Sequence, residues 1–263
     1  MAASLNRIDV NSRLEAAIEA LQTERRRTAD ELEALKTFER HIRAISSEEP
    51  NINNRQPVAL TTTETGHSAG LRQVRKAYES TLMDVPHYFE EYDDTYPESL
   101  AEEFSPDIAS ALTNGTAFNK QCKQTVLSAI SESQSSREAL LDVTDRERES
   151  IRNARAELEP LFEECDQMRS LQFDKEAFGA LDAYRARLQV ILDNCQALSH
   201  RRQKAIFDSR RIQKLPADVP DITIYFYQTL DTDYPVMSLV AELLETITDC
   251  ERRIERAMAT CHA

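Results

Sequence analysis

Glycine is scarce in this chain of 263 residues, and tryptophan is absent. Only 4 glycines occur, whereas a parallel-sheet enzyme needs glycine-rich turns to join its strands and to approach phosphates. No run of 18 apolar residues occurs either, so the sequence predicts no membrane-spanning helix. These absences favour a helical protein over an α/β enzyme.

Lysine is scarce too, although charged residues make up 30% of the chain. Only 7 of the 32 basic residues are lysines, and 46 acidic residues leave a formal net charge of −14. Multimolar salt screens the repulsion between surface carboxylates within a few ångströms, so a halophilic cytoplasm favours such a surface. We therefore expect a halophilic protein. An ordinary acidic, arginine-rich coiled coil is the alternative.

The five cysteines are widely spaced and form no Cys-x-x-Cys pair, so the sequence lacks the common zinc pattern. An odd number of cysteines in an acidic chain predicts free thiols in a reducing compartment. The first nine residues have no apolar core of signal-peptide length. We therefore expect a cytoplasmic protein without a structural metal.

Ala, Leu, Glu and Arg dominate the composition, as is typical of long helices and coiled coils. Apolar residues recur every three and four positions over about 5–45, 133–168 and 175–214. In the first segment one heptad position holds Leu14, Leu21, Thr28, Leu35 and Ile42. Heptad positions that a coiled coil normally buries also hold three arginines, namely Arg25, Arg148 and Arg155. We expect each of them to pair with an acidic residue.

The predicted fold is all-α, an antiparallel helical bundle with long coiled-coil-like helices and short helical elbows. We expect a long N-terminal helix over 1–46, a flexible polar linker over 47–69, and an acidic region of short helices over 70–132. An antiparallel hairpin then covers 133–215, and an elbow with a C-terminal helix covers 216–263. Pro160 should kink the second long helix, and the β-prone residues 222–227 predict a short extended piece.

Two segments, 84–104 and 218–243, share an order of residues. Each has Asp-Val-Pro, then Tyr-Phe, then an aspartate-rich stretch ending in Tyr-Pro, with Ser-Leu and Ala-Glu close behind. The match needs two small insertions, so chance matching of common residues is the alternative to a duplication. We interpret both segments as elbows whose tyrosines pack at helix junctions.

Five runs of the chain carry a family resemblance, namely Val74–Tyr78, Met83–Tyr88, Ser99–Phe104, Ser136–Asp142 and Asp145–Ser150. In these runs the sequence resembles a group of uncharacterised haloarchaeal helical proteins, a domain of unknown function. The resemblance covers about residues 5–260. It implies a salt-loving archaeal source, in agreement with the charge balance, but it implies no activity and no functional residues.

Recognisable catalytic patterns are missing from the sequence. The five histidines show no pattern with a nucleophile, and neither Gly-x-Ser-x-Gly nor a phosphate-binding loop occurs. His87, Glu90 and Glu91 have the spacing of metal ligands on a helix, but a di-metal bundle needs Glu-x-x-His on two helices, and the one literal case is Glu64 to His67. An exposed acidic turn is the alternative. We expect no catalytic, cofactor or metal site.

Charge is distributed unevenly along the chain. Residues 77–119 include ten acidic residues and no Lys or Arg. Residues 199–214 include one acidic residue, Asp208, and six basic ones, which are our candidate partner-binding residues: Arg201, Arg202, Lys204, Arg210, Arg211 and Lys214. This basic stretch could contact nucleic acid. Alternatively, it is the charged face of a bundle helix or a docking strip for the acidic segment, within or between chains.

We therefore expect a non-catalytic interaction or scaffold protein of a halophilic archaeon. It would bind a protein partner, or associate with itself, through its coiled-coil-like helices. One alternative is a nucleic-acid-associated regulator that uses residues 199–214, although the acidic segment would repel phosphates. An enzyme or metal protein with its site in the bundle core is the third reading. Neither a cofactor nor a membrane partner is expected.

Overall fold

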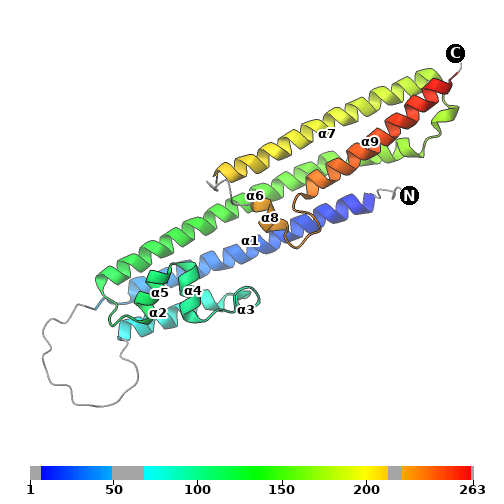
Figure 1. Ribbon diagram of the computed structural model, residues 1–263. Coiled ribbons are helices and arrows are strands. Elements are labelled where there is room, and N and C mark those ends of the chain that lie inside the picture. The colour runs from blue at the N-terminus through cyan, green and yellow to red at the C-terminus, as the bar shows by residue number, and fades with distance from the viewer. Residues whose placement is uncertain (1–6, 49–67, 213–220, 262–263) are drawn as a thin grey trace, which may run out of the picture. The chain divides into compact units, whose positions relative to one another are not determined.

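The computed structural model describes residues 7–48, 68–212 and 221–261. Within these ranges the chain folds into helices without any strand, which confirms the all-α prediction (Figure 1). Within the same ranges, no helix has both the length and the apolar character needed to cross a membrane. Most of the linker expected at 47–69 lies outside the described residues, as does Lys214.

The elements in chain order are α1 (Arg7–Ala44), α2 (Ala69–Glu79), η1 (Leu82–Asp84), α3 (Tyr88–Glu91), α4 (Tyr96–Glu103), α5 (Pro106–Thr113), α6 (Lys120–Ser170), η2 (Phe173–Lys175), α7 (Phe178–Ile212), α8 (Ile222–Tyr227) and α9 (Pro235–Thr260).

Helix α6 begins well before the expected residue 133 and continues through Pro160. Asn119 explains the early start, because its side chain accepts the Cys122 backbone N–H at 2.9 Å and caps the helix.

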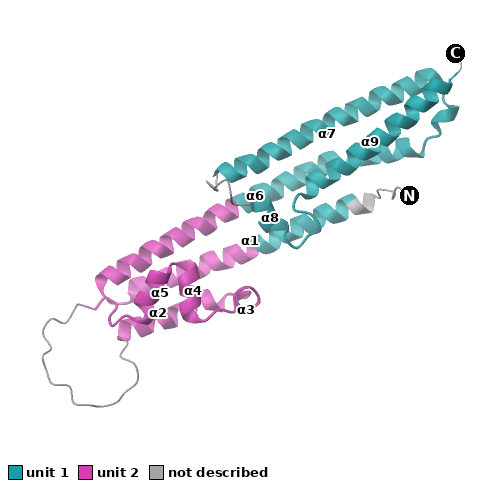
Figure 2. Ribbon diagram, in the orientation of Figure 1, with its two compact units in different colours: residues 1–24, 143–263 teal, residues 25–142 magenta. Residues whose placement is uncertain are grey.

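The chain divides into two compact units, to both of which α1 and α6 contribute (Figure 2). Unit 1 comprises residues 1–24 and 143–263, and unit 2 comprises residues 25–142. The heptad seam of α1 is buried in both units, as predicted: Leu14 and Leu21 in unit 1, and Thr28, Leu35 and Ile42 in unit 2. Burial of this seam supplies the stability that a narrow amphipathic helix lacks in isolation.

In unit 1, α6 and α7 form an antiparallel hairpin. Glu164 of α6 pairs with Arg187 of α7, and Glu157 pairs with Arg201. Residue numbers fall along α6 as they rise along α7, which is the pattern of antiparallel helices. Arg253 of α9 holds the turn between them, because its guanidinium donates to the carbonyls of Arg169 at 2.9 Å and Leu171 at 2.7 Å.

Two arginines at the heptad seams find acidic partners within the chain. Arg155 of α6 donates to the Asn11 side-chain oxygen at 2.9 Å and to Glu15 at 2.7 Å, both on α1. Arg148 pairs with Asp145 at 2.9 Å on its own helix. Because these pairs are internal, the charges of Arg148 and Arg155 give no separate reason to expect a second chain.

The extended piece expected at residues 222–227 is instead the short helix α8. One face of this helix buries Thr223, Phe226 and Tyr227, which are spaced three and four residues apart. The β-propensity of the flanking isoleucines is a weak preference that tertiary packing overrides. The helical turn also brings the Tyr227 hydroxyl within 2.6 Å of Glu147 Oε1 on α6.

Arg202, Glu147 and Tyr227 form a buried network inside unit 1. Arg202 Nη1 donates to Glu147 Oε2 at 2.8 Å and to Ser150 Oγ at 2.9 Å, while Nη2 donates to Glu147 Oε1. The Arg202 and Glu147 side chains are only 2% and 8% exposed. One positive and one negative charge balance here, and several hydrogen bonds satisfy them, which is the condition for tolerating a buried ion pair.

We expect Arg202→Ala to lower the free energy of unfolding by about 3–5 kcal/mol, because it leaves the buried Glu147 carboxylate without its counter-charge. The matched control is Arg201→Ala on the same helix. Its exposed pair with Glu157 should contribute at most about 1 kcal/mol. Urea unfolding followed by circular dichroism measures both values. An equal loss in the free energy of unfolding for the two variants would contradict the claim that the buried ion pair contributes more than the exposed one.

Candidate functional site

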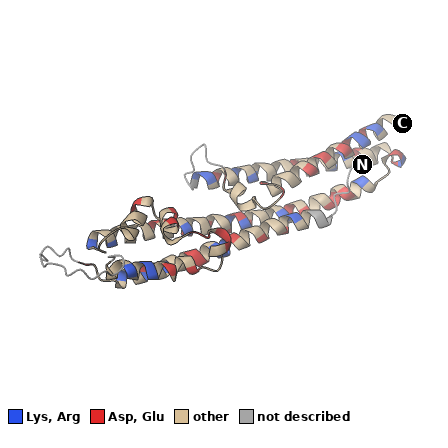
Figure 3. Ribbon diagram, turned by 60° about the horizontal axis from the view of Figure 1, so that its bottom comes forward, with Lys and Arg blue, Asp and Glu red and all other residues tan. Residues whose placement is uncertain are grey.

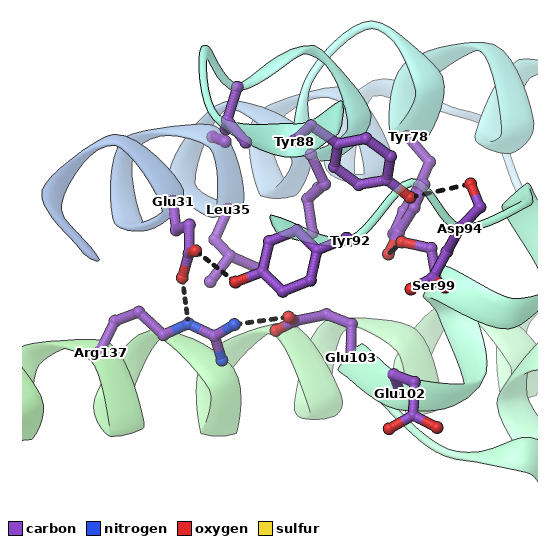
Figure 4. Close-up of a pocket in the computed structure, with 13 residues that line it drawn as sticks. Glu31, Leu35, Tyr78, Tyr88, Tyr92, Asp94, Ser99, Glu102, Glu103 and Arg137 are labelled. Carbon is purple, nitrogen blue, oxygen red and sulfur yellow. Dashed lines mark hydrogen bonds and ion pairs between the residues drawn. The ribbon is translucent and has the colours of Figure 1, made fainter. Parts of the chain in front are cut away.

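Unit 2 contains a cavity of about 170 Å³ between α1, the segment from α2 to α4, and α6 (Figure 4). Three aromatic rings line it, those of Tyr78, Tyr88 and Tyr92. Its charged lining consists of four carboxylates and one guanidinium, namely Glu31, Asp94, Glu102, Glu103 and Arg137. Sites for drug-sized ligands occupy roughly 300–1,000 Å³, so this cavity has room only for a compact group.

The local sequence of the elbow, residues 84–104, brings the cavity walls together. Pro86 ends the preceding turn because a proline disfavours helical geometry in the residue before it. Asp93, with φ of 50°, adopts the left-handed conformation just after α3, which aspartate tolerates better than most residues. Helix α4 then begins at a capping box, in which the Thr95 N–H donates to Glu98 Oε2 at 2.9 Å. The chain therefore turns sharply between Tyr88 and Ser99.

Arg137 of α6 lies between two carboxylates from different elements, as Figure 4 shows. Its Nε donates to Glu31 Oε2 of α1 at 3.1 Å, and its Nη2 donates to Glu103 Oε2 of α4 at 2.6 Å. Glu31 Oε1 also accepts the Tyr92 hydroxyl at 2.8 Å and lies 3.1 Å from His87 Nε2. Two carboxylates therefore share one guanidinium in this cluster.

Among the carboxylates of this cluster, Glu103 has an oxygen that lacks a hydrogen bond within the described residues. Its side chain is 14% exposed, and its Oε1 is buried without a hydrogen-bond partner among the described residues. Burial raises the pKa of Glu103 above its ordinary value, an effect that Arg137 and the Ser133 side chain only partly offset and that the nearby Glu31 carboxylate increases. The cavity lining therefore combines two carboxylates that share one guanidinium with three tyrosine rings.

In each unit, an arginine and a tyrosine hydroxyl donate hydrogen bonds to the carboxylate of a glutamate on a long helix. The sets are Arg202, Tyr227 and Glu147 in unit 1, and Arg137, Tyr92 and Glu31 in unit 2. Each tyrosine belongs to one of the two elbow segments that share a residue order. Duplication and chance matching are both open readings of the shared residue order, and the two segments contribute the same kind of contact. Only the set in unit 2 includes a second carboxylate and borders the cavity described above.

The segment that contributes Tyr88, Tyr92 and Glu102 to the cavity lining also exposes aromatic and acidic side chains. Phe89 of α3 is 78% exposed, and Tyr92 directly after α3 is also exposed. Glu90, Asp93 and Glu102 are exposed in the same segment. The sequence had marked this stretch as acidic and aromatic but predicted only a packing role for its tyrosines.

The six basic residues expected to bind a partner do not form one surface. Arg202 is buried against Glu147, so it is not accessible to a partner. Arg201 pairs with Glu157, and Arg210 pairs with Asp221 at 2.8 Å. Lys204 and Arg211 are exposed, while Lys214 lies outside the described residues. Basic and acidic residues are interspersed along the long helices (Figure 3), and this arrangement fits the charged face of a bundle helix.

The residues with metal-ligand spacing are not brought together either. His87 faces Glu31, Glu91 pairs with Arg27 at 2.6 Å, and Glu90 is exposed. Across the part of the chain that the structure describes, no group of three or more His, Cys, Asp or Glu side chains could hold a metal ion. The Glu64 to His67 pair lies outside that part.

All five cysteines are free thiols, and three of them, Cys165, Cys195 and Cys250, are buried in unit 1. Burial raises the pKa of Cys165 to about 12 and that of Cys195 to about 11. Because the thiolate is the reactive form of cysteine, these side chains act as small apolar groups of the core.

Sequence reasoning did not find the cavity cluster because its members are far apart in the chain. Glu31 comes from α1, Tyr92 and Glu103 from the elbow, and Arg137 from α6, and no spacing rule connects these three segments. One signal was present, since the acidic elbow contains no basic residue and a buried carboxylate there would need an arginine from elsewhere. Which arginine supplies that charge depends on how α6 packs in unit 2.

A family model with the description "Domain of unknown function (DUF7260)" matches residues 12–251, which is most of the chain. None of the curated proteins and none of the solved structures matches the chain. The description of the family assigns no activity and no site residues. The haloarchaeal source suggested by the charge balance and the resemblance stays a prediction.

We expect the stability difference between Glu103→Gln and the wild type to change with pH. The folded-state pKa of Glu103 is raised. At pH values between the ordinary pKa and this raised pKa, the folded chain therefore binds more protons than the unfolded chain. Wild-type stability therefore falls as pH rises through this interval. Glutamine does not titrate, so the variant should gain stability relative to the wild type. Urea unfolding at several pH values from about 3 upward measures the difference.

Glu98→Gln provides a control of opposite sign. Hydrogen bonds from the Thr95 side chain and backbone lower the pKa of Glu98. The wild type therefore gains stability as pH rises from the lowered value to the ordinary one, and this variant should lose stability relative to it. A pH-independent difference for Glu103→Gln would contradict a raised pKa at that position.

Proposed function

We propose that this chain, which belongs to the DUF7260 family, is a non-catalytic interaction protein that binds a basic segment of a protein partner at the elbow of unit 2. One observation carries the proposal: Phe89, 78% exposed, packs edge-on against the ring of Tyr88, which lines the cavity. Interface centres are enriched in aromatic residues that fill pockets, and polar groups surround them. The elbow has both components.

The charge of the elbow supports a basic partner. Residues 77–119 contain no Lys or Arg, and Glu90, Asp93 and Glu102 are exposed there. A complementary segment rich in Lys or Arg would be attracted to this surface and oriented on it. Nucleic acid would be repelled by the same carboxylates, and the basic stretch proposed for nucleic acid has Arg201, Arg202 and Arg210 in ion pairs within unit 1.

Self-association is the second candidate, supported by exposed apolar side chains on α7. Phe178, Val190 and Phe207 of this helix are exposed, the last of them by 62%. A second copy that packs on α7 would remove these side chains from water. The elbow remains the stronger site, because there the aromatic side chains adjoin a cavity and a complementary charge can be named.

The setting that we propose is the cytoplasm of a halophilic archaeon, where the chain acts as a scaffold or regulator for its partner. The net charge of −14 and the 7 lysines among 32 basic residues support this setting. High salt reduces the repulsion among exposed carboxylates that would otherwise oppose folding.

A photo-crosslinking residue in place of Phe89 in the full chain, expressed in its source cells, should link to a partner segment rich in Lys or Arg. Mass spectrometry of the linked peptide identifies the segment. The matched control carries the same residue in place of Phe207, which is also exposed but lies in unit 1. Links to the chain itself would favour self-association, and the same products from both positions would contradict a specific elbow site.

We expect the thermal unfolding midpoint to rise as KCl is increased from dilute buffer to multimolar concentration. The reason is that salt screens the repulsion from the excess of 46 acidic over 32 basic residues. Circular dichroism on heating measures the midpoint. A midpoint that is highest in dilute buffer would contradict the halophilic assignment while leaving the elbow site unaffected.

A further inference from the structure

We infer that the cavity of unit 2 binds a compact organic cation, that is, a guanidinium or alkylammonium head group. The cavity volume of about 170 Å³ suits a head group rather than a drug-sized molecule. This inference rests on the proposed function only for the source of the cation, which there is a Lys or Arg side chain of the partner. A free guanidinium compound or amine has the same chemistry.

The charge imbalance beneath the elbow is the first argument. Arg137 is shared between Glu31 and Glu103, and Asp94 and Glu102 add two further carboxylates to the cavity lining. His87 also faces Glu31. Four carboxylates against one guanidinium leave the cavity lining with an excess of acidic groups that a bound cation would balance.

The matching network of unit 1 shows what a balanced cluster looks like in this chain. Glu147 there accepts two N–H groups from one arginine and a hydroxyl from Tyr227. Its charges match one to one, and its members are buried. Glu103, by contrast, keeps an oxygen that is buried and has no partner among the described residues. A buried carboxylate oxygen without a donor is destabilising, and a cation in the cavity that Glu103 lines would offset the negative charge of this carboxylate.

The aromatic lining is the second argument. Tyr78, Tyr88 and Tyr92 line the same cavity as Glu103 (Figure 4). The faces of tyrosine rings attract guanidinium and ammonium groups, most strongly where water is excluded. Together with the excess of carboxylates over guanidinium in the lining, these rings favour an organic cation over an anion or a neutral apolar ligand. A bare metal ion is disfavoured because no metal-binding group occurs among the described residues.

Titration of the full chain with methylguanidinium tests the inference. Tyrosine emission reports binding directly, because the chain has no tryptophan and three of its 8 tyrosines line the cavity. We expect saturable binding of methylguanidinium and none of N-methylurea, its neutral isostere. Binding of both compounds with equal affinity, or of neither, would overturn the inference.

Two pairs of variants locate the bound cation. Glu103→Gln should weaken binding at least about tenfold, whereas Glu90→Gln, which removes an equal charge from outside the cavity, should change it less than about twofold. Tyr92→Leu should bind more weakly than Tyr92→Phe, because only the phenylalanine keeps the aromatic face. Circular dichroism checks that each variant is folded, and Tyr92, being exposed, is the safer position. Equal binding by Glu103→Gln and Glu90→Gln, together with equal binding by Tyr92→Leu and Tyr92→Phe, would overturn the inference.

The titration and the crosslinking from position 89, taken together, identify the source of the cation. If methylguanidinium binds and Glu103→Gln also abolishes crosslinking from position 89, the partner supplies the head group. If methylguanidinium binds but position 89 yields no partner, the cavity is a small-molecule site and the proposed function fails alone. If a partner is crosslinked equally well in Glu103→Gln and methylguanidinium does not bind, the cavity inference fails alone.

Discussion

A carboxylate that is buried or half-buried on a long helix needs hydrogen bonds from other elements, and each unit contains one such carboxylate. Glu147 and Glu31 are each bound by an arginine from a packed helix and by a tyrosine hydroxyl from an elbow. The charge cannot be left unpaired at this depth without a large loss of stability. Each glutamate therefore ties an elbow and a second helix to the long helix that carries it.

The same contact has different consequences in the two units. In unit 1 the charges are equal and the three side chains are buried, so the network serves stability. In unit 2 one arginine serves two carboxylates, and the cluster borders a cavity lined by tyrosines. An additional carboxylate beside one guanidinium is costly where the groups are removed from water. The arrangement suits a site that a positively charged group completes, and the exposed Phe89, packed on Tyr88, offers a contact for the rest of a partner.

Internal pairing also changes how the charge pattern of the sequence is understood. The stretch from Ser199 to Lys214 has the composition of a basic strip, yet Arg201, Arg202 and Arg210 are neutralised by Glu157, Glu147 and Asp221. These acids come from α6 and from the residue before α8, so the local sequence could not show that the arginines were paired. The acidic elbow, by contrast, keeps several of its carboxylates exposed.

The sequence by itself determined the all-α class, the antiparallel arrangement of long helices and the buried seam of α1 that runs through Leu14, Leu21, Thr28, Leu35 and Ile42. These features follow from hydrophobic periodicity, which is local and repeats along the chain. Tertiary structure alone decided that residues 222–227 are helical, that Arg202 is buried, and that Glu31, Tyr92, Glu103 and Arg137 meet around a cavity. The physical reason is that packing and charge pairing join residues distant in the chain, and their energies exceed the local propensities that a sequence pattern records.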